Sequence, residues 1–168
     1  GRGSELFTAD GTRYLDFAMG IAVNCLGHSN PKLIDALTKQ AQTVWHTSNL
    51  YRIKQAERLA QRLVDNTFAD KVFFCNSGAE AVEAGYKVIR RYFYARGESH
   101  KHRIISLRNS FHGRTLGAIA SAFNPMHCDG FIVGDAGFDQ VEFGDLEALK
   151  AAITTNTAGI VLEPVQGE

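Results

Sequence analysis

The sequence predicts an α/β fold with a mostly parallel sheet, because short apolar segments alternate with helical patterns along most of the chain. The clearest apolar segments, residues 71–75, 103–107 and 159–162, are separated by segments with helical periodicity. Strands that alternate with helices need crossover connections, which place neighbouring strands parallel. A chain of 168 residues can bury roughly 70% of the surface that its unfolded form exposes, so it needs no disulfide or metal to fold.

A β-hairpin is predicted near the start of the chain. Residues 6–9 and 12–17 carry apolar side chains and flank Asp10-Gly11. An Asp-Gly pair between two such segments is a strong hairpin signal. Residues 18–30 contain glycine and show no clear period, so we expect irregular structure there.

Helices are predicted where apolar residues recur every three or four positions. One helix begins at Pro31, because proline suits the first helical position. Further helices are expected at about 56–66, 78–96, 116–122 and 146–153. Besides the segments named above, residues 131–133 are a weaker strand candidate.

Charge and cysteine content exclude several classes of protein. The 18 Lys and Arg residues balance the 18 Asp and Glu residues, which argues against a nucleic-acid binder with a strong basic field. No apolar run approaches the roughly 18 to 20 residues that cross a bilayer. Cys25, Cys75 and Cys128 are far apart and form neither a disulfide framework nor a metal cluster. We therefore expect a cytoplasmic protein with reduced thiols.

A candidate phosphate site lies at Asn76-Ser77-Gly78-Ala79-Glu80, between a predicted strand and a helix. The free N–H groups and the positive dipole end of a helix bind anions, and glycine lets a phosphate approach the backbone. Ser77 and Glu80 also match a capping box, in which both side chains satisfy the helix's own N–H groups. These residues alone leave both interpretations open. The chain has no Gly-x-Gly-x-x-Gly or Gly-x-x-x-x-Gly-Lys-Ser/Thr motif, which disfavours dinucleotide and nucleoside-triphosphate enzymes.

A second candidate segment, residues 111–115, has the sequence Phe-His-Gly-Arg-Thr and should open on the same edge of the sheet. Phe111 can stack on a planar ring, and the forked donor of Arg114 suits a carboxylate. A core phenylalanine and a solvent-facing arginine are the alternatives. Glu163 and Glu168 bracket a turn after the last predicted strand, where solvated surface is the alternative.

Eight segments, in this order along the chain, resemble the class III pyridoxal-phosphate-dependent aminotransferases. They are residues 14–17, 20–24, 26–28, 45–49, 68–70, 72–81, 111–115 and 163–168. Within that family they are most similar to the enzymes that act on acylated ornithine. The resemblance implies a fold-type I PLP-dependent transferase. Residues 1–41 would be the N-terminal segment of the small domain, and residues 42–168 the first part of the large PLP-binding domain, whose sheet would be incomplete.

The resemblance implies pyridoxal 5'-phosphate (PLP) as the cofactor. The residues that it implies for cofactor binding are Ser77, Gly78, Ala79, Phe111, His112 and Glu163. The first three would bind the phosphate at the helix N-terminus. Phe111 would lie against the pyridine ring, with His112 close by and without an obvious role in proton transfer.

The resemblance also implies substrate-binding residues, which are Arg114, Glu168, Ile21 and Tyr51. Arg114 would bind the substrate carboxylate, and Glu168 would line the substrate side, where related ornithine enzymes pair it with a later arginine. Ile21 and its neighbour Ala22, together with Tyr51, would lie near the substrate's far end, contributed across a dimer interface. The implied partners are an amino donor, 2-oxoglutarate and a second copy of the chain, with no nucleic acid and no membrane.

No residue of the chain matches the family's Schiff-base lysine or the aspartate that pairs with the pyridine nitrogen. The lysines present are Lys32, Lys39, Lys54, Lys71, Lys87, Lys101 and Lys150. We expect the chain to be an N-terminal fragment, with both residues beyond Glu168 and no activity of its own. Two positions also depart from the family pattern: Val82 replaces a usual asparagine, and Asn30 replaces a common histidine.

The predicted activity of the full protein is transfer of the δ-amino group of N2-acetyl-L-ornithine to 2-oxoglutarate, a step of arginine biosynthesis. Within the enzyme class, the alternatives are succinylornithine, ornithine and 4-aminobutyrate transaminases. The alternative outside it is a non-catalytic α/β module that binds phosphate-bearing ligands, an interpretation that draws on the absent lysine.

Overall fold

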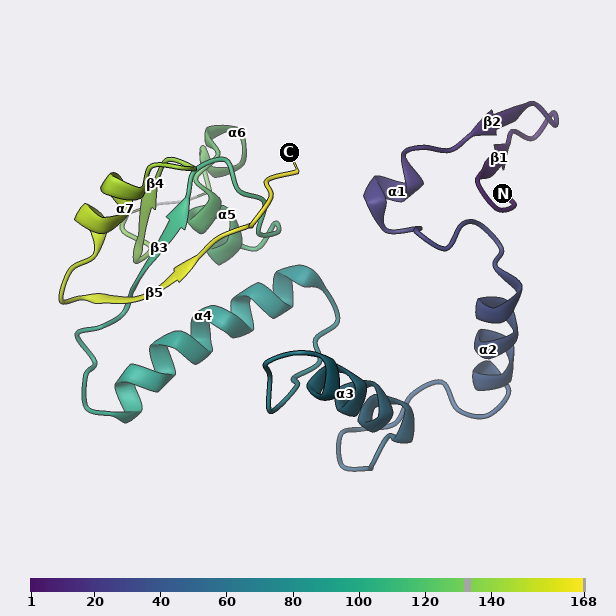
Figure 1. Ribbon diagram of the computed structural model, residues 1–168, viewed down its shortest axis with the longest axis horizontal. Helices are drawn as coiled ribbons and strands as arrows, with labels where there is room; N and C mark the ends of the chain where they lie inside the picture. Colours follow the sequence, from purple (N-terminus) through teal and green to yellow (C-terminus); the bar gives the residue numbers. More distant parts are fainter. Residues whose placement is uncertain (132–133, 168) are drawn as a thin grey trace. The chain divides into compact units, whose positions relative to one another are not determined.

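The computed structural model describes residues 1–131 and 134–167 (Figure 1). The chain divides into an N-terminal unit, Gly1–Val72, and a sheet unit, Phe73–Glu168. The N-terminal unit contains a hairpin and three helices, and the sheet unit contains a three-stranded sheet and four helices in its described part. In the described ranges, no helix combines the length and the apolar character needed to cross a membrane.

The hairpin prediction is confirmed. Strands β1 (Glu5–Phe7) and β2 (Arg13–Leu15) pair antiparallel, with Leu6 opposite Tyr14. Gly11 in the turn has φ +88°, a conformation that glycine adopts at no steric cost.

Three helices follow the hairpin in the N-terminal unit. They are α1 (Met19–Ala22), α2 (Pro31–Ala41) and α3 (Lys54–Asn66). The two longer helices confirm the predicted periodicity, whereas α1 is a short turn in the segment expected to be irregular. Asn30 caps α2, because its side chain accepts a hydrogen bond of 3.0 Å from the Lys32 N–H. This cap gives Asn30 a structural role at a position where the family often has histidine.

The long helix α4 (Gly78–Ala95) is the first regular element of the sheet unit, and its bounds agree with the helix predicted at residues 78–96. Tyr86 on α4 is buried, and its ring lies 5.0 Å from that of Phe138 in an edge-to-face arrangement. Val82 and Ile89 pack against the same cluster. Val82 is therefore part of the apolar contact between α4 and the sheet.

The sheet has the order β4-β3-β5 and both pairings are parallel. Its strands are β3 (Arg103–Leu107), β4 (Phe138–Val141) and β5 (Thr157–Val161). The remaining helices are α5 (Leu116–Ala122), α6 (Pro125–Cys128) and α7 (Leu146–Ala152). The α/β class with a parallel sheet is confirmed.

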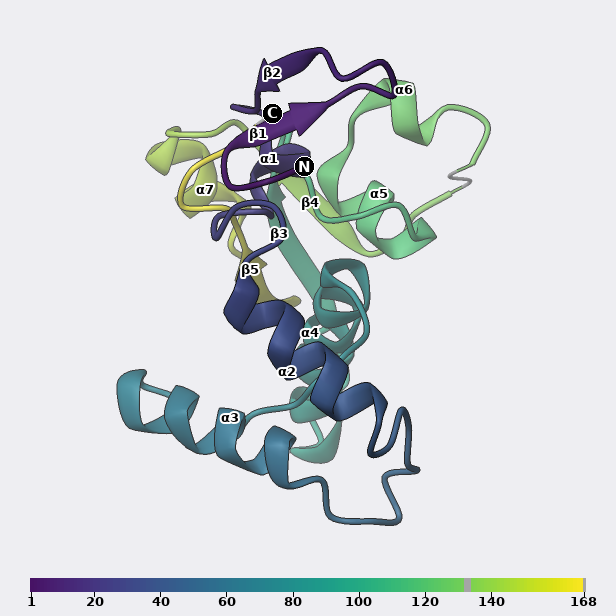
Figure 2. The ribbon, with the colours of Figure 1, turned by 90° about the vertical axis from the view of Figure 1, so that its right-hand side faces the viewer.

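Helices cover both faces of this sheet. Ile104 and Ile105 are consecutive on β3 and fully buried, so their side chains point to opposite faces. Ile104 packs with Tyr86 of α4 and Ala120 of α5, whereas Ile105 lies in a cluster that contacts Leu149 of α7. Accordingly α4 and α5 lie on one face and α7 on the other (Figure 2).

The prediction of a strand at residues 71–75 is wrong. No part of this segment is paired in the described structure, and the Phe73 side chain is 80% exposed. A strand exists only with a hydrogen-bonded partner, which the described residues do not provide here. Of the candidate strand at residues 131–133, Phe131 lies in a turn, and Ile132 and Val133 lie outside the described residues.

Candidate functional site

Ser77 caps α4, so the capping interpretation is confirmed. Its backbone is extended, at φ −152° and ψ 165°, and its Oγ accepts a hydrogen bond of 3.2 Å from the Glu80 N–H. The Glu80 carboxylate reaches back and accepts from the Asn76 N–H at 2.7 Å and from the Asn76 side chain at 2.9 Å. The return bond thus goes to Asn76, one residue before the position that a standard capping box uses.

The cap leaves room for an anion at the same helix end. The N–H groups of Gly78 and Ala79 precede the first helical hydrogen bonds, and among described residues they have no acceptor. A Cβ atom added to Gly78 would meet no atom of the described residues within 4 Å, so the backbone is open to a ligand. Two free donors and the positive end of an 18-residue helix fit a phosphate.

The 111–115 loop lies directly against this helix end. A Cβ atom on Gly113 would lie 2.6 Å from the Ala79 Cβ, so only glycine permits the contact. Gly113 also has φ +117°, which disfavours any other residue. Thr115 caps α5 and donates a hydrogen bond of 2.5 Å to Glu83 of α4. The two segments that the sequence singled out therefore meet.

Glu163 joins the end of the sheet to the same loop. Its Oε2 accepts a hydrogen bond of 3.0 Å from the Phe111 N–H. Close to it, the Gln166 side chain donates to the Arg108 carbonyl at 2.9 Å and to the Ser110 hydroxyl at 3.3 Å. Sequence reasoning missed Gln166 and Ser110, although their position after β5 and β3, at the carboxyl edge of a parallel sheet, was a usable signal.

His112 is the most enclosed of the predicted site residues. Its side chain is only 6% exposed, and its Nε2 is buried without a hydrogen-bond partner in the described structure. Burial lowers the pKa of His112, and the nearby charge of Glu163 opposes that shift. A buried ring nitrogen without a partner among the described residues is unusual, and it fits a neutral imidazole that can form a hydrogen bond with a polar atom of a ligand.

Arg114 and Phe111 stack at the open side of the loop. The Arg114 guanidinium carbon lies 5.8 Å from the centre of the Phe111 ring. Among described residues, no carboxylate lies within ion-pair distance of Arg114. Arg114 also borders a cavity of about 330 Å³ with Ile119 and Phe131. The guanidinium is available to an anionic ligand.

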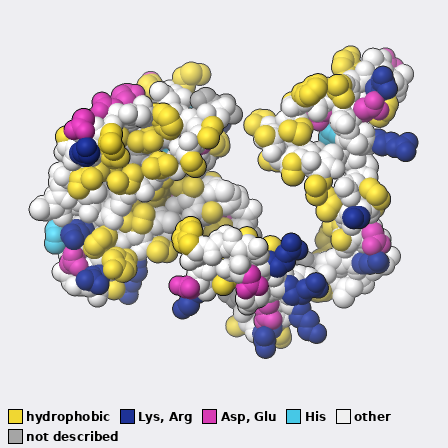
Figure 3. Space-filling model, in the orientation of Figure 1, with side chains coloured by type: hydrophobic (Ala, Val, Ile, Leu, Met, Phe, Trp, Pro, Cys, Tyr) yellow, Lys and Arg dark blue, Asp and Glu magenta, His cyan; other side chains and the backbone are white. Residues whose placement is uncertain are grey.

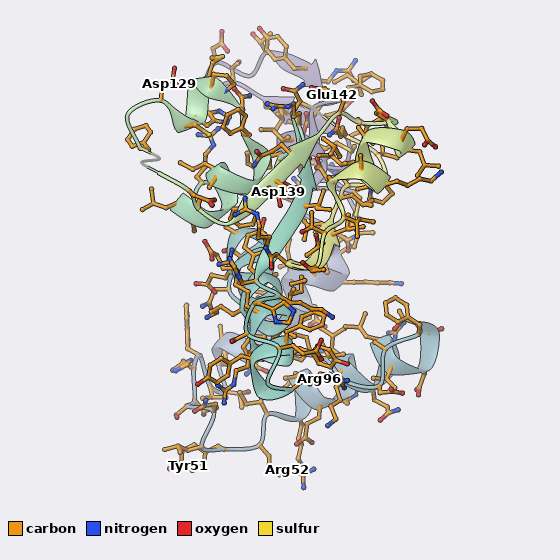
Figure 4. The ribbon with its side chains drawn as sticks, turned by 90° about the vertical axis from the view of Figure 1, so that its left-hand side faces the viewer. Tyr51, Arg52, Arg96, Asp129, Asp139 and Glu142 are labelled. Atoms are coloured by element: carbon orange, nitrogen blue, oxygen red, sulfur yellow. The ribbon has the colours of Figure 1, made fainter. Side chains whose placement is uncertain are left out.

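Three predicted residues lie outside the described part of the sheet unit. Ile21 lies on α1, and Tyr51 lies on the segment that leads into α3; both belong to the N-terminal unit and are exposed. Figure 4 shows Tyr51 beside Arg52. Glu168 lies outside the described residues. The site that the sheet unit assembles by itself therefore consists of Ser77, Gly78, Ala79, Phe111, His112, Arg114 and Glu163.

The fold and this site agree with what comparison with known proteins shows. The family model for class-III aminotransferases matches residues 1–168, so the chain belongs to that family. The family implies PLP as cofactor, and the open helix end, the free amides and the unpaired His112 nitrogen fit a phosphate-bearing group with further polar atoms.

Among curated relatives, the chain is 55% identical over 168 residues to the acetylornithine aminotransferase of Agrobacterium fabrum. The match covers 100% of this chain and 42% of that protein. The chain thus spans about two fifths of the length of such relatives.

Two solved structures show the same fold. The N-acetylornithine aminotransferase of Stenotrophomonas maltophilia is 35% identical, with a TM-score of 0.80 over 99% of this chain and 41% of that one. A structure of the ornithine aminotransferase of Toxoplasma gondii with partial occupancy of PLP is 28% identical, with a TM-score of 0.93 over 99% of this chain and 40% of that one.

Proposed function

We propose that the whole protein carrying this chain is an acetylornithine aminotransferase, which transfers the δ-amino group of N2-acetyl-L-ornithine to 2-oxoglutarate. The observation that carries the proposal is the assembly of the α4 N-terminus, the 111–115 loop and Glu163 into one site. The sequence identity of 55% between this chain and a relative of that name supports the choice of substrate.

The proposed cofactor contacts come from this assembled site. Ser77, Gly78 and Ala79 bind the PLP phosphate, and the Ser77 hydroxyl can donate to it while it caps α4. Phe111 lies against the ring, and its N–H bond to Glu163 fixes the loop that presents it. When bound, PLP supplies an electron sink for the carbanion formed at the substrate carbon.

The proposed substrate contacts divide between the two units. Arg114 binds a substrate carboxylate through its forked donors. These donors are available because Arg114 forms no ion pair among the described residues, although it lies over the Phe111 ring. Ile21 and Tyr51 would contact the far end of the substrate, and Glu168 would line the substrate side. The chain spans about two fifths of the length of its relatives, and none of its lysines matches the family's Schiff-base lysine. We propose that the 168 residues alone would not catalyse the reaction.

The remaining proposals concern the protein's surroundings. We place residues 1–41 in the small domain and residues 42–168 in the large one, and we propose a cytoplasmic homodimer with active sites at the interface. Sedimentation of the whole protein tests the dimer, and a monomer with full activity would contradict it.

The test of the proposed function is a comparison of amino donors. Steady-state kcat/KM of the whole protein, loaded with PLP, is measured with N-acetylornithine, N-succinylornithine, ornithine and 4-aminobutyrate. The proposal expects the acetylated donor to be used best. If another donor is used best, that donor is the substrate and the proposed one is wrong. If PLP binds but no donor is turned over, the non-catalytic module is favoured.

A further inference from the structure

The segment that follows β5, residues 162–167, is not held in place by a hydrophobic core. None of its residues is buried, and Leu162 and Val165 are 51% and 80% exposed. Figure 3 shows hydrophobic side chains at the surface of the part of the chain that carries β3, β4 and β5. Hydrogen bonds must therefore fix the position of this segment.

Gln166 forms a bridge from this segment to the turn that follows β3. Its side-chain Nε2 donates to the Arg108 carbonyl at 2.9 Å and to the Ser110 hydroxyl at 3.3 Å. An amide nitrogen carries two hydrogens, so Gln166 can bind both acceptors at once. One side chain thus holds both ends of the turn at residues 108–110.

The 108–110 turn has an uncommon backbone, which this bridge spans. Asn109, between the two acceptors, has φ +59°, in the left-handed region that residues other than glycine seldom adopt. Ser110 is only 5% exposed, and its hydroxyl also donates to the Leu107 carbonyl at 2.6 Å. A backbone of this kind persists where its surroundings impose it. Gln166 and Ser110 supply that constraint, and they set the direction in which the chain leaves β3.

The bridge lies next to the hydrogen bond between Phe111 and Glu163. That bond, of 3.0 Å, joins the residue after the turn to the same segment that carries Gln166. His112 follows directly, and its Nε2 is buried without a partner among the described residues. Since Glu163 and Gln166 are three residues apart, loss of the bridge would free the carboxylate as well as the turn. Phe111 and His112 would then lose their fixed position in the candidate site.

We propose that Gln166 is a positioning residue, whose side-chain amide holds the 108–110 turn against the segment after β5 and thereby fixes Phe111 and His112 for contact with the cofactor. The inference rests on the proposed function, which supplies PLP as the ligand. Both acceptors of the Gln166 amide in the described structure belong to the turn, so Gln166 acts on the cofactor through the two residues that follow it. Residues that are fixed before a ligand arrives lose less freedom when it binds, so the bridge should strengthen PLP binding.

The first test needs no cofactor and uses Gln166→Met in the whole apoprotein, because methionine has a similar length but no donor. The backbone amide of Phe111 should exchange with solvent about tenfold faster than in the wild type, since its bond to Glu163 opens more often. The backbone amide of Ile105, in the middle of β3, should change by less than about twofold. This split separates a local bridge from a general loss of stability.

The matched control is Gln140→Met, because Gln140 also donates its side-chain amide to a backbone carbonyl, that of Ala120 at 3.1 Å. Gln140 lies on β4, and its bond goes to α5 rather than to the turn after β3. The control should leave the exchange rate of the Phe111 amide within about twofold of the wild type. If Gln166→Met does not fold, Ser110→Ala, which removes one of the two acceptors, takes its place in both tests.

The second test measures PLP binding to the whole apoprotein by absorbance titration. Gln166→Met should bind PLP about fivefold to tenfold more weakly than the wild type, and Gln140→Met should match the wild type. Gln166→Glu should also bind PLP more weakly, because a carboxylate has the size of the amide but cannot donate to the Arg108 carbonyl.

The inference is overturned by an unchanged exchange rate at Phe111 in Gln166→Met, by an equal acceleration at Phe111 and Ile105, or by wild-type PLP affinity in this variant. Wild-type affinity in Gln166→Glu would overturn it as well, because the side chain would then only fill space. A wild-type protein that binds no PLP would instead overturn the proposed function, and the exchange rates would still decide whether Gln166 holds the turn.

Discussion

The two units of the chain keep their structure by different means. In the sheet unit, Ile104 and Ile105 are fully enclosed between helices, and every buried residue of the described structure belongs to this unit. Residues 1–72 are all described, and none of them is buried. No described residue covers the apolar faces of α2 and α3, and Ile34, for example, is 51% exposed. A core therefore defines the sheet unit, whereas turns, caps and hydrogen bonds define the N-terminal unit.

The largest expected effect is a break in the core of the sheet unit. Ile104→Ala should lower the unfolding free energy of this unit by about 2 to 5 kcal/mol, because a fully buried side chain leaves a cavity. Hydrogen exchange of the β3 backbone amides, followed at increasing urea concentration, measures this unfolding free energy. The matched Ile34→Ala in α2 should cost less than about 1 kcal/mol. Equal losses at the two sites would contradict the difference between the units.

The next effect concerns the contact between the loop and α4. Gly113→Ala forces a Cβ atom against Ala79 at a positive φ, and we expect PLP to bind at least about tenfold more weakly. Titration of PLP into the whole apoprotein, followed by absorbance, measures this affinity. Gly130→Ala is the control, since Gly130 also has positive φ, at +79°, but no atom of the described residues lies within 4 Å of the added Cβ. Equal affinity in the two variants would show that the contact does not shape the site.

A smaller effect is expected at the ion pairs of Arg103, the first residue of β3. Arg103 binds Asp139, which Figure 4 labels, through two hydrogen bonds of 2.7 and 2.8 Å, and it also pairs with Asp135 at 2.6 Å. Arg103→Lys loses the two-pronged geometry and should destabilise the sheet unit by about 1 kcal/mol. Lys39→Ala in α2, which breaks an exposed pair, should cost about 0.5 kcal/mol or less. Thermal unfolding compares the two, and equal losses would weaken the contrast.

The smallest effect is a pH dependence at His112. Burial lowers the pKa of folded His112 below its unfolded value of about 6.5. Below that value the unfolded state binds a proton that the folded state rejects, so stability falls as pH decreases from about 6.5 toward the lowered value. His112→Asn should flatten this dependence in urea titrations of the sheet unit between about pH 7 and 5. A slope that the substitution leaves unchanged would assign the dependence to another group.

Much of this architecture was predictable where the signal is local. Asp10-Gly11, Pro31 and Ser77 each determine the backbone through their own conformational preference or hydrogen bond, and the hairpin, α2 and α4 begin where those residues indicate. The meeting of the 111–115 loop with α4 also followed from the sequence, since both segments were expected at one edge of the sheet.

The errors fall where a partner distant in sequence decides the outcome. Strand β4 carries Asp139 and Gln140, whose polar side chains hid it, yet Arg103 pairs with the first and the Ala120 carbonyl accepts from the second at 3.1 Å. Residues 71–75 have the composition of a strand and no paired neighbour in the described structure. The hydrogen bond from Phe111 to Glu163 likewise depends on the folded sheet, and no spacing in the sequence could reveal it.

The docking of α4 has a thermodynamic consequence. Tyr86 fixes the middle of the helix in the core, and Ile89 fits closely over Gly159 of β5, where an added Cβ would lie 3.3 Å from it. The two free amides at its start exist as an anion site only when these contacts are made. A ligand that binds there selects the folded state and raises the stability of the whole sheet unit in proportion to the logarithm of its concentration. The supply of cofactor and the lifetime of the fold are thereby linked.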